Sequence, residues 1–304
     1  MHGLGNDFIV LDRFSEQSGE AYSELARKLC HRQFGIGADG LLVVLPSQEA
    51  DVRMRIFNPD GSEPEMCGNG IRCLARYAYD QGYVSYNPMR IETLAGILTL
   101  QLTIEPQDSE FGAGTAAAVP GKASALTNRA ADVPGKVTGV RVDMGEPILR
   151  PAAIPVLADG EQVVAEKLTV DGEVFTFTAV SMGNPHCVIF VDDYAGLDFY
   201  RLGPLLEKHE LFPRKTNVEF IKVEAPDELT MKVWERGAGP TLACGTGACA
   251  SLVAAVLNSK TERRATVHLP GGDLLVEWGA DNHVYMTGPA TYVFRGEWLE
   301  DRLR

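Results

Sequence analysis

The feature that most limits the fold of this chain is an internal repeat. Residues 52–70 (VRMRIFNPDGSEPEMCGNG) align with residues 228–247 (ELTMKVWERGAGPTLACGTG) at a constant offset of 177 positions, which sets Cys67 opposite Cys244. Two more pairs of segments recur in the same order: LGNDFIVLD (4–12) with MGNPHCVIF (182–190), and ETLAGILTL (92–100) with VHLPGGDLLV (267–276). The repeat predicts two homologous halves related by a pseudo-twofold axis.

Each half is predicted to be rich in strands, with one principal helix. RMRIF and MKVWE alternate as strands do, and RIETLAGILTLQLTI suggests two strands around a glycine turn. A helix is expected after Cys67, ending near Gly82, because apolar residues recur at helical spacing at Ile71, Leu74, Ala75 and Ala78. The segment after Cys244, ACASLVAAVL, is apolar on all sides and predicts a buried helix. Two further helices are expected, around 20–33 and 199–209. The predicted class is α+β.

The composition of one segment predicts the boundary between the halves. Residues 105–136 are rich in Ala, Gly, Pro and Ser and offer little to a core, so we expect a flexible insertion there. The first half would comprise residues 1–118 and a returning segment, 287–304. The second half would comprise residues 137–286.

Length and charge narrow the class of protein. The chain has 304 residues, 45% of them hydrophobic, which is enough for two domains with their own cores. Its net charge of -13 disfavours nucleic acid and anionic membranes as partners. The sequence contains no apolar run of membrane-spanning length and begins without the pattern of a signal peptide. Six cysteines are too few for a disulfide scaffold, so we expect a cytoplasmic protein with reduced thiols.

The cysteines invite several interpretations. Free cysteine is often a small buried packing residue, and that interpretation suits Cys30, Cys73, Cys187 and Cys249. It suits Cys67 and Cys244 poorly, because their flanking glycines offer little to pack against. On a helix neither Cys67 and Cys73 nor Cys244 and Cys249 share a face. The spacing also fits neither a zinc site nor a redox C-x-x-C motif, so we expect no metal.

A helix N-terminus explains the glycines of CGNG and CGTG. Small residues there leave the first backbone N–H groups uncovered, and these donors form a site for an anion such as a carboxylate. The positive end of the helix dipole can also lower the pKa of a thiol. The sequence therefore predicts a reactive thiol beside an anion site in each half, with lowered pKa values.

Two equivalent thiols suit the inversion of a carbon stereocentre. A single base tends to return a proton to the face it came from, whereas inversion requires a base on one face and an acid on the other. Two half-domains that present one thiol each across a cleft would supply this pair. The two helix N-termini would hold the α-carboxylate and stabilise the developing negative charge.

The ordered motifs resemble one known family along nearly the whole chain. MHGLGNDF, GIGADG, FNPDGSEPEMCGNGIRC, MGNPH, TNVEF, ERGAGPTLACGTGA and the GPA near residue 289 are together similar to the diaminopimelate epimerases. The resemblance implies interconversion of LL- and meso-diaminopimelate, for lysine and peptidoglycan, without pyridoxal phosphate, metal or other cofactor. It implies two pseudo-symmetric domains, each a barrel-like mixed sheet around a central helix, with the active site in the cleft between them. It also implies a homodimer.

The resemblance further implies roles for individual residues. Cys67 and Cys244 are the implied acid–base pair, and His186 and Glu235 are implied to tune the thiols. The backbone N–H groups of the segments after each cysteine are implied to hold the reacting carboxylate, and Arg236 suits a carboxylate through a bidentate fork. The full set of implied substrate-binding residues is Asn6, Asn58, Gly68, Asn69, Asn184, Asn217, Glu235, Arg236, Gly245 and Thr246.

Three features depart from the family pattern. Some members have glutamine where this chain has Gly40, so that substrate contact is lost or made by the backbone. Members usually have a short strand before the MHGLGNDF motif, so either the start differs or an absent strand leaves a sheet edge exposed. The insertion at 105–136 is longer than the family requires.

Other functions remain open at this point. Proline and hydroxyproline racemases of the same superfamily usually have histidine where this chain has Asn69, and they lack the GNPH and ERGAG contexts. The phenazine-linked isomerases lack the paired cysteines. A thiol redox sensor or a non-catalytic amino-acid-binding protein belongs to a different class, and activity that survives loss of both thiols would favour that class.

Overall fold

The computed structural model describes residues 1–15, 21–106 and 135–299. All four predicted helices are present: α1 (Tyr22–Leu29), α2 (Gly68–Asp80), α3 (Phe199–Glu207) and α4 (Gly245–Leu257). The chain leaves α2 through Gly82, whose φ of 70° suits a residue without a side chain. A short 3-10 helix at Pro151–Ala153 is an addition to the prediction.

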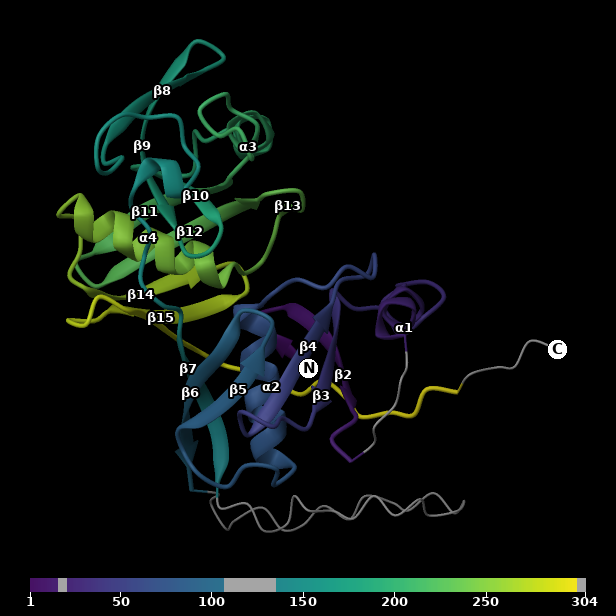
Figure 1. Ribbon diagram of the computed structural model, residues 1–304. Coiled ribbons are helices and arrows are strands. Elements are labelled where there is room, and N and C mark those ends of the chain that lie inside the picture. The colour runs from purple at the N-terminus through teal and green to yellow at the C-terminus, as the bar shows by residue number, and fades with distance from the viewer. Residues whose placement is uncertain (16–20, 107–134, 300–304) are drawn as a thin grey trace.

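Strands form the rest of the regular structure in the described residues (Figure 1). The predicted insertion at 105–136 lies, apart from its ends, outside the described residues. In chain order the strands are β1 (His2–Gly3), β2 (Asn6–Asp12), β3 (Gly40–Leu45), β4 (Val52–Phe57), β5 (Met89–Thr93), β6 (Gly96–Glu105), β7 (Lys136–Asp143), β8 (Glu166–Val170), β9 (Glu173–Ser181), β10 (Pro185–Phe190), β11 (Asn217–Ala225), β12 (Glu228–Glu235), β13 (Gly239–Pro240), β14 (Arg264–Leu269), β15 (Gly272–Trp278) and β16 (Val284–Gly288).

The strand pairing repeats between the halves. In the first half β2 and β3 are parallel, β3 and β4 antiparallel, β4 and β5 parallel, and β5 to β7 antiparallel. The second half repeats this order of parallel and antiparallel pairs. β10 and β11 are parallel, β11 and β12 antiparallel, β12 and β14 parallel, and β14 to β16 antiparallel. The helices α2 and α4 follow β4 and β12, and α1 and α3 precede β3 and β11. The prediction of two pseudo-symmetric α+β halves is therefore confirmed.

The two halves are joined edge to edge. β7 and β16, which are equivalent strands of the two repeats, pair with each other antiparallel, with Val142 opposite Met286. One path of hydrogen-bonded strands therefore runs from β1 to β8 through both halves. After β16 the chain returns to the first half, where His2 and Thr291 exchange backbone hydrogen bonds of 2.8 Å (Figure 1). The residue limits of the halves given above remain a prediction.

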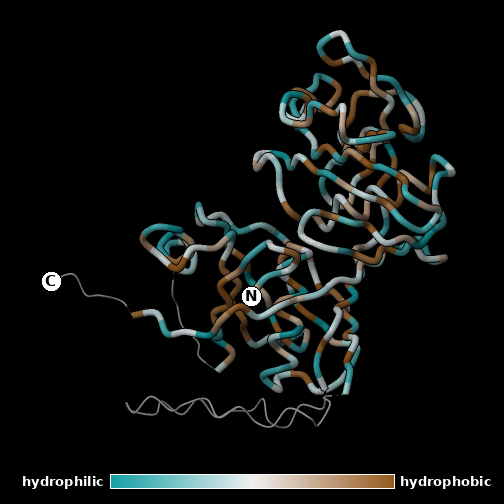
Figure 2. Tube along the Cα trace, turned by 180° about the vertical axis from the view of Figure 1, so that it is seen from behind, coloured by the Kyte–Doolittle hydropathy of each residue, from teal (hydrophilic) through white to brown (hydrophobic). Residues whose placement is uncertain are grey.

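Each principal helix is enclosed by its own sheet. α2 contacts β3, β4, β6 and β7, and α4 contacts strands from β9 to β16. The smaller helices α1 and α3 pack against the other face of β3 and of β11 and β12. A strand such as GLLVVL is therefore buried on both faces, which explains its unbroken apolar sequence. Figure 2 shows the two lobes from behind, with hydrophobic segments inside each.

The four cysteines that were predicted to be packing residues are buried. Cys73 and Cys249 lie in the enclosed helices α2 and α4, within the cluster that spans both halves. Cys187 and Cys30 lie in the clusters beneath α3 and α1. This prediction is confirmed for all four residues.

One tight approach between the halves gives a prediction about stability. Gly271, between β14 and β15, donates its N–H to the Leu242 carbonyl, and a Cβ at this position would lie 2.1 Å from the Leu4 carbonyl oxygen. Gly271→Ala is expected to lower the free energy of unfolding by about 1–3 kcal/mol, because the two backbones must move apart. Thermal unfolding measures the change. Gly196→Ala is the control, since its Cβ would meet nothing within 4 Å, and an equal loss in both variants would contradict the prediction.

Candidate active site

Each of the two repeated cysteines stands at the N-terminus of an enclosed helix. Cys67 is the N-cap of α2 with φ −142° and ψ 117°, and Cys244 is the N-cap of α4 with φ −128° and ψ 108°. Each carbonyl accepts the first helical hydrogen bond, from Ile71 and Ala248. Each thiol lies beside the backbone N–H groups of the first turn of its helix, from Asn69 and Gly70 at Cys67 and from Gly247 at Cys244.

The two helix N-termini converge on a single side chain. A Cβ on Gly68 would lie 3.1 Å from Cε of Met286, and a Cβ on Gly245 would lie 2.9 Å from its Sδ. Met286 belongs to β16, beside the junction of the halves. The glycine after each cysteine is therefore required for the close approach of both helices to this thioether.

A hydrogen bond connects the two cysteine motifs directly. The Asn69 amide nitrogen donates to the Asn6 Oδ1 at 3.2 Å and to the Ala243 carbonyl, directly before Cys244, at 3.4 Å. The Cys67 thiol lies 3.9 Å from the same Asn6 oxygen. Residues 6, 67, 69 and 243, from both halves, thus form one neighbourhood, as the prediction of a site between the halves requires.

The second half supplies a buried polar cluster beside Cys244. His186 and Glu219 are both fully buried, with His186 Nδ1 2.7 Å from Glu219 Oε1. The other ring nitrogen, Nε2, lies 2.9 Å from Asn184 Oδ1. The Cys244 sulfur lies 3.6 Å from the Thr246 hydroxyl. Asn184, His186 and Thr246, all predicted site residues, therefore lie in the half that contains Cys244.

Three more predicted residues are held by local hydrogen bonds in this half. The Asn217 amide donates to the Pro185 carbonyl at 2.8 Å and accepts from the Arg236 backbone N–H at 2.9 Å. Glu235 accepts a hydrogen bond of 2.5 Å from the Thr241 hydroxyl. The Arg236 guanidinium donates to the Arg214 carbonyl. Asn217 at the start of β11 and Glu235 at the end of β12 are thus held in place by these hydrogen bonds. The Arg236 side chain lies at the surface.

Two predicted residues of the first half have no contact with the thiols among the described interactions. Asn58 hydrogen bonds to Ser62 within its own turn. Gly40 begins β3 opposite Phe8, in the register position that Asn217 occupies opposite His186 in the second half. A Cβ on Gly40 would lie 3.1 Å from the Phe57 carbonyl oxygen and 3.2 Å from the ring of Phe8, so a counterpart of Asn217 in this half would require these neighbours to shift.

Burial dominates the acidity of both thiols. Burial raises the pKa of Cys67, against the backbone N–H groups of the first turn and the charge of Arg72. It raises the pKa of Cys244 well above its ordinary value, and the carboxylates of Glu235 and Glu219 raise it further. The predicted lowering of both pKa values is therefore wrong, because desolvation disfavours each thiolate more than the helix amides favour it.

Two charged residues near the thiols were not predicted from the sequence as site residues. Glu219 lies two residues after Asn217, a spacing that places both on one face of β11. Arg72 lies one turn after Gly68 on α2 and donates to the Asn69 side chain at 2.9 Å. The strand and helix periods could have indicated both residues. Their complete burial could not be read from residue type, because charged side chains are seldom buried.

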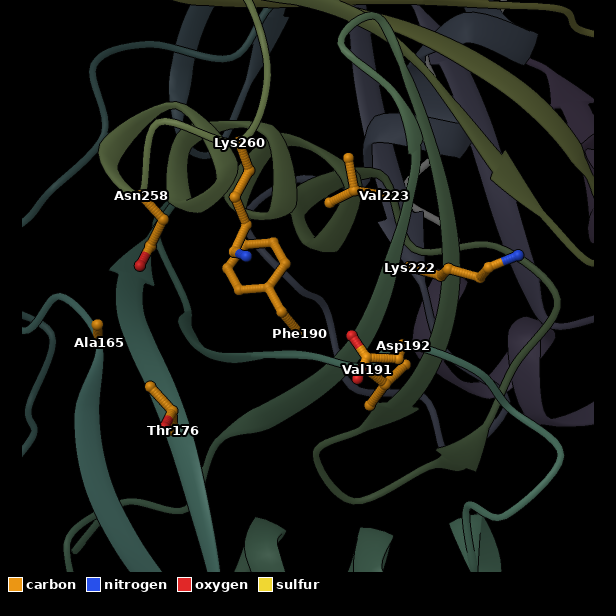
Figure 3. A pocket seen from close by; sticks show the side chains of 9 residues that line it. All are labelled: Ala165, Thr176, Phe190, Val191, Asp192, Lys222, Val223, Asn258 and Lys260. Carbon is orange, nitrogen blue, oxygen red and sulfur yellow. The ribbon is translucent and has the colours of Figure 1, made fainter.

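Other features of the described residues lie apart from this site. A hollow of about 530 Å³ in the second half is lined by Ala165 before β8, by residues of β9 to β11 and the loop after β10, and by Asn258 and Lys260 after α4 (Figure 3). The Lys260 ammonium lies 5.0 Å from the Phe190 ring centroid. None of the predicted site residues lines it. Within the described ranges no helix is long and apolar enough to cross a membrane. No group of three or more His, Cys, Asp or Glu side chains in these ranges is arranged to hold a metal ion.

Solved structures of low sequence identity share this fold. A phenazine biosynthesis protein of the PhzF family from Bacillus anthracis matches with a TM-score of 0.63 and 18% identity, over 98% of this chain and 95% of that one. A hydroxyproline epimerase from Agrobacterium vitis matches with a TM-score of 0.61 and 14% identity, over 96% of this chain and 89% of that one. At such identities the likeness concerns the fold alone.

Sequence comparison identifies the family. The family model for diaminopimelate epimerase matches residues 1–119 and 178–293, which include both cysteines. A diaminopimelate epimerase from Desulfitobacterium hafniense is 66% identical over 100% of this chain and 98% of its own length. One from Moorella thermoacetica is 52% identical over 99% of this chain and 98% of its own length. With its paired cysteine-capped helices and these full-length matches, the chain belongs to the diaminopimelate epimerases, a family of isomerases.

Proposed function

We propose that this enzyme interconverts LL- and meso-diaminopimelate by a two-base reaction in which Cys67 and Cys244 are the acid and the base. The convergence of two cysteine-capped helix N-termini on Met286 is the observation that carries the proposal. Membership of the family supports the substrate. The repeat supports the mechanism, since it presents two equivalent thiols from opposite halves.

In the proposed reaction a thiolate removes the α-proton from one face of the substrate. The electron pair of the broken C–H bond is stabilised through the α-carboxylate, which accepts hydrogen bonds from backbone N–H groups after each cysteine, at Gly68-Asn69 and Gly245-Thr246. The opposite thiol then delivers its proton to the other face. The configuration is inverted, and the two sulfurs have exchanged protonation states.

The polar residues around the thiols have proposed roles in binding. Asn6 and Asn184 lie beside Cys67 and His186 and suit the amino and carboxylate groups of the reacting centre. Asn58, Asn217 and Arg236 would bind the remaining polar groups, with the arginine as the partner for a carboxylate. His186 and Glu235 would adjust the protonation of the thiols.

Isotope exchange tests the proposal. In D₂O with reductant, LL-diaminopimelate is expected to acquire deuterium at the α-carbon as the meso form appears, because the proton that is delivered comes from a solvent-exchanged thiol. Mass spectrometry and chiral separation follow the two changes together. Absence of both would overturn the proposal. Proline in the same assay tests the racemase alternative, and we expect neither exchange nor inversion with it.

We also propose a cytoplasmic homodimer, without nucleic acid as a partner. The acidic composition, with a net charge of -13, supports a protein that does not bind phosphate backbones. Exposed apolar side chains after β16, at Val293, Phe294 and Leu299, offer a surface that a second copy could cover. Sedimentation at micromolar concentration measures the mass directly, and a monomer would contradict the dimer.

A further inference from the structure

The two halves of the site differ at one matched pair of positions. In the second half β10 and β11 carry His186 and Glu219, and in the first half β2 and β3 carry Phe8 and Leu42 at the equivalent register positions. All four side chains are buried. The chain therefore has an ionisable pair beside one thiol and an apolar pair beside the other.

Geometry places Glu219 against Cys244. A Cβ on Gly247, in the first turn of α4, would lie 2.8 Å from Glu219 Oε1 and 3.2 Å from the Cys244 sulfur, so both atoms adjoin the same point. At the equivalent Gly70 of α2 the nearest atom is Cδ2 of Leu42, at 3.0 Å. Glu219 is thus the counterpart of a leucine, and it faces the turn that begins at the second thiol.

The two carboxyl oxygens of Glu219 have unequal contacts. Oε1 lies 2.7 Å from His186 Nδ1, while Oε2 has no hydrogen-bond partner among the described residues although it is fully buried. Burial of a carboxylate with one unpartnered oxygen is costly. A packing role alone does not account for a carboxylate here, because the first half fills the same position with Leu42.

We propose that Glu219 is a positioning residue of the Cys244 half: it fixes the His186 ring through Nδ1, and it gives Cys244 a carboxyl neighbour where Cys67 has Leu42. This inference rests on the proposed two-thiol function, in which one thiol is protonated while the other is ionised. A negative charge on one side only makes the two repeated cysteines chemically unequal.

The charged groups around the two thiols support this inequality. Glu235 on β12 and Glu219 on β11 both act on Cys244 to raise its pKa, and His186 on β10 lies behind Glu219. Cys67 is influenced by Glu235 as well, but the other charge that acts on it is Arg72 of α2, which lowers its pKa. Glu235 is therefore shared, whereas Glu219 and Arg72 act on one thiol each.

Alkylation of the two thiols against pH tests the proposal. The whole enzyme is treated with iodoacetamide from pH 6 to 10, and peptide mass mapping gives the rate at Cys67 and at Cys244 separately, since only the thiolate reacts. In Glu219→Gln, whose amide can still contact His186 Nδ1, the alkylation rate of Cys244 is expected to rise about tenfold at each pH below its midpoint. This corresponds to a midpoint lower by about 1 pH unit, and the rate at Cys67 is expected to stay unchanged. We also expect kcat to fall by about 10- to 100-fold with little change in KM, because binding groups remain in place.

Two further variants separate charge from structure. Glu219→Asp keeps a carboxylate and is expected to keep the Cys244 midpoint near that of the wild type. Glu207→Gln removes another buried carboxylate of the same half, one that binds Trp234, and is expected to move neither midpoint. An unchanged Cys244 midpoint in Glu219→Gln, or equal shifts at both thiols, would overturn the proposal.

The same measurements distinguish failure of this inference from failure of the proposed function. Alkylation reports ionisation without turnover, so it tests Glu219 whatever the reaction is. The two-thiol function fails instead if Cys67→Ser or Cys244→Ser retains turnover, whatever the alkylation profile of Glu219→Gln.

Discussion

Replacement of Cys67 or Cys244 by serine is expected to lower kcat by roughly 10²- to 10⁴-fold, the range of general acid–base catalysis. Both residues cap helices whose N-termini converge, and a hydroxyl in either place is too weak an acid to exchange a proton with a carbon centre. Because an enzyme cannot change the equilibrium between its substrates, the loss in kcat/KM must be equal in the two directions. Initial rates from LL- and from meso-diaminopimelate measure both.

Cys249→Ala supplies the matched control for the cysteine variants. Cys249 is fully buried in α4, one turn beyond Cys244, so its replacement tests whether loss of any thiol from this helix impairs the enzyme. We expect its turnover to stay within a few-fold of the wild type, and melting temperatures confirm that all variants are folded. Near-normal turnover in Cys67→Ser or Cys244→Ser would show that the reaction does not use two bases.

Arg72→Met is expected to lower the free energy of unfolding by about 2–4 kcal/mol and to impair turnover. The buried guanidinium donates to the Gly68 carbonyl at 3.1 Å, the Asn69 Oδ1 at 2.9 Å and the Pro289 carbonyl at 3.2 Å. Methionine has a similar length but leaves these three acceptors without a donor. Removal of a buried cation recovers part of the cost of desolvation, which keeps the net loss below the sum for three hydrogen bonds.

The effect of Arg72→Met on turnover has a separate cause. Asn69 connects the two cysteine motifs, and Arg72 fixes the orientation of its amide. Thermal unfolding with turnover measured well below the melting temperature separates the two effects. Arg53→Met is the control, because the contact of Arg53 within the described residues is a surface pair with Glu92, whose loss should cost less than about 1 kcal/mol. Equal melting temperatures and rates for Arg72→Met and the wild type would contradict the prediction.

The repeat made most of the fold predictable. Met54 to Phe57 and Met231 to Val233 alternate as strands, and each cysteine precedes a glycine and an apolar helix, so the order strand, cysteine, helix could be assigned in both halves. Which strands pair in parallel and which antiparallel could not be predicted, because this depends on contacts between segments that are distant in the sequence. The antiparallel pairing of β7 with β16 across the junction of the halves is one such contact.

The candidate site was predictable by position and less so by chemistry. Motifs indicated Asn6 and Asn69, which lie beside Cys67, and His186, which contacts the Glu219 carboxyl group next to Cys244. The acidity of the thiols was predicted with the wrong sign, because a helix terminus is visible in the sequence whereas the depth of burial is not. Glu219 was overlooked because a glutamate in a strand ordinarily faces solvent.

The pairing of β7 with β16 affects how the protein unfolds. Four backbone pairs, from Tyr285 opposite Asp143 to Gly288 opposite Val140, make the two lobes one hydrogen-bonded ladder, and the cluster of buried residues around α2 and α4 is continuous across them. Neither lobe can melt without exposing the edge strand and part of the core of the other. Although the sequence looks like two copies in tandem, we expect a single cooperative unfolding transition in calorimetry, with equal calorimetric and van't Hoff enthalpies.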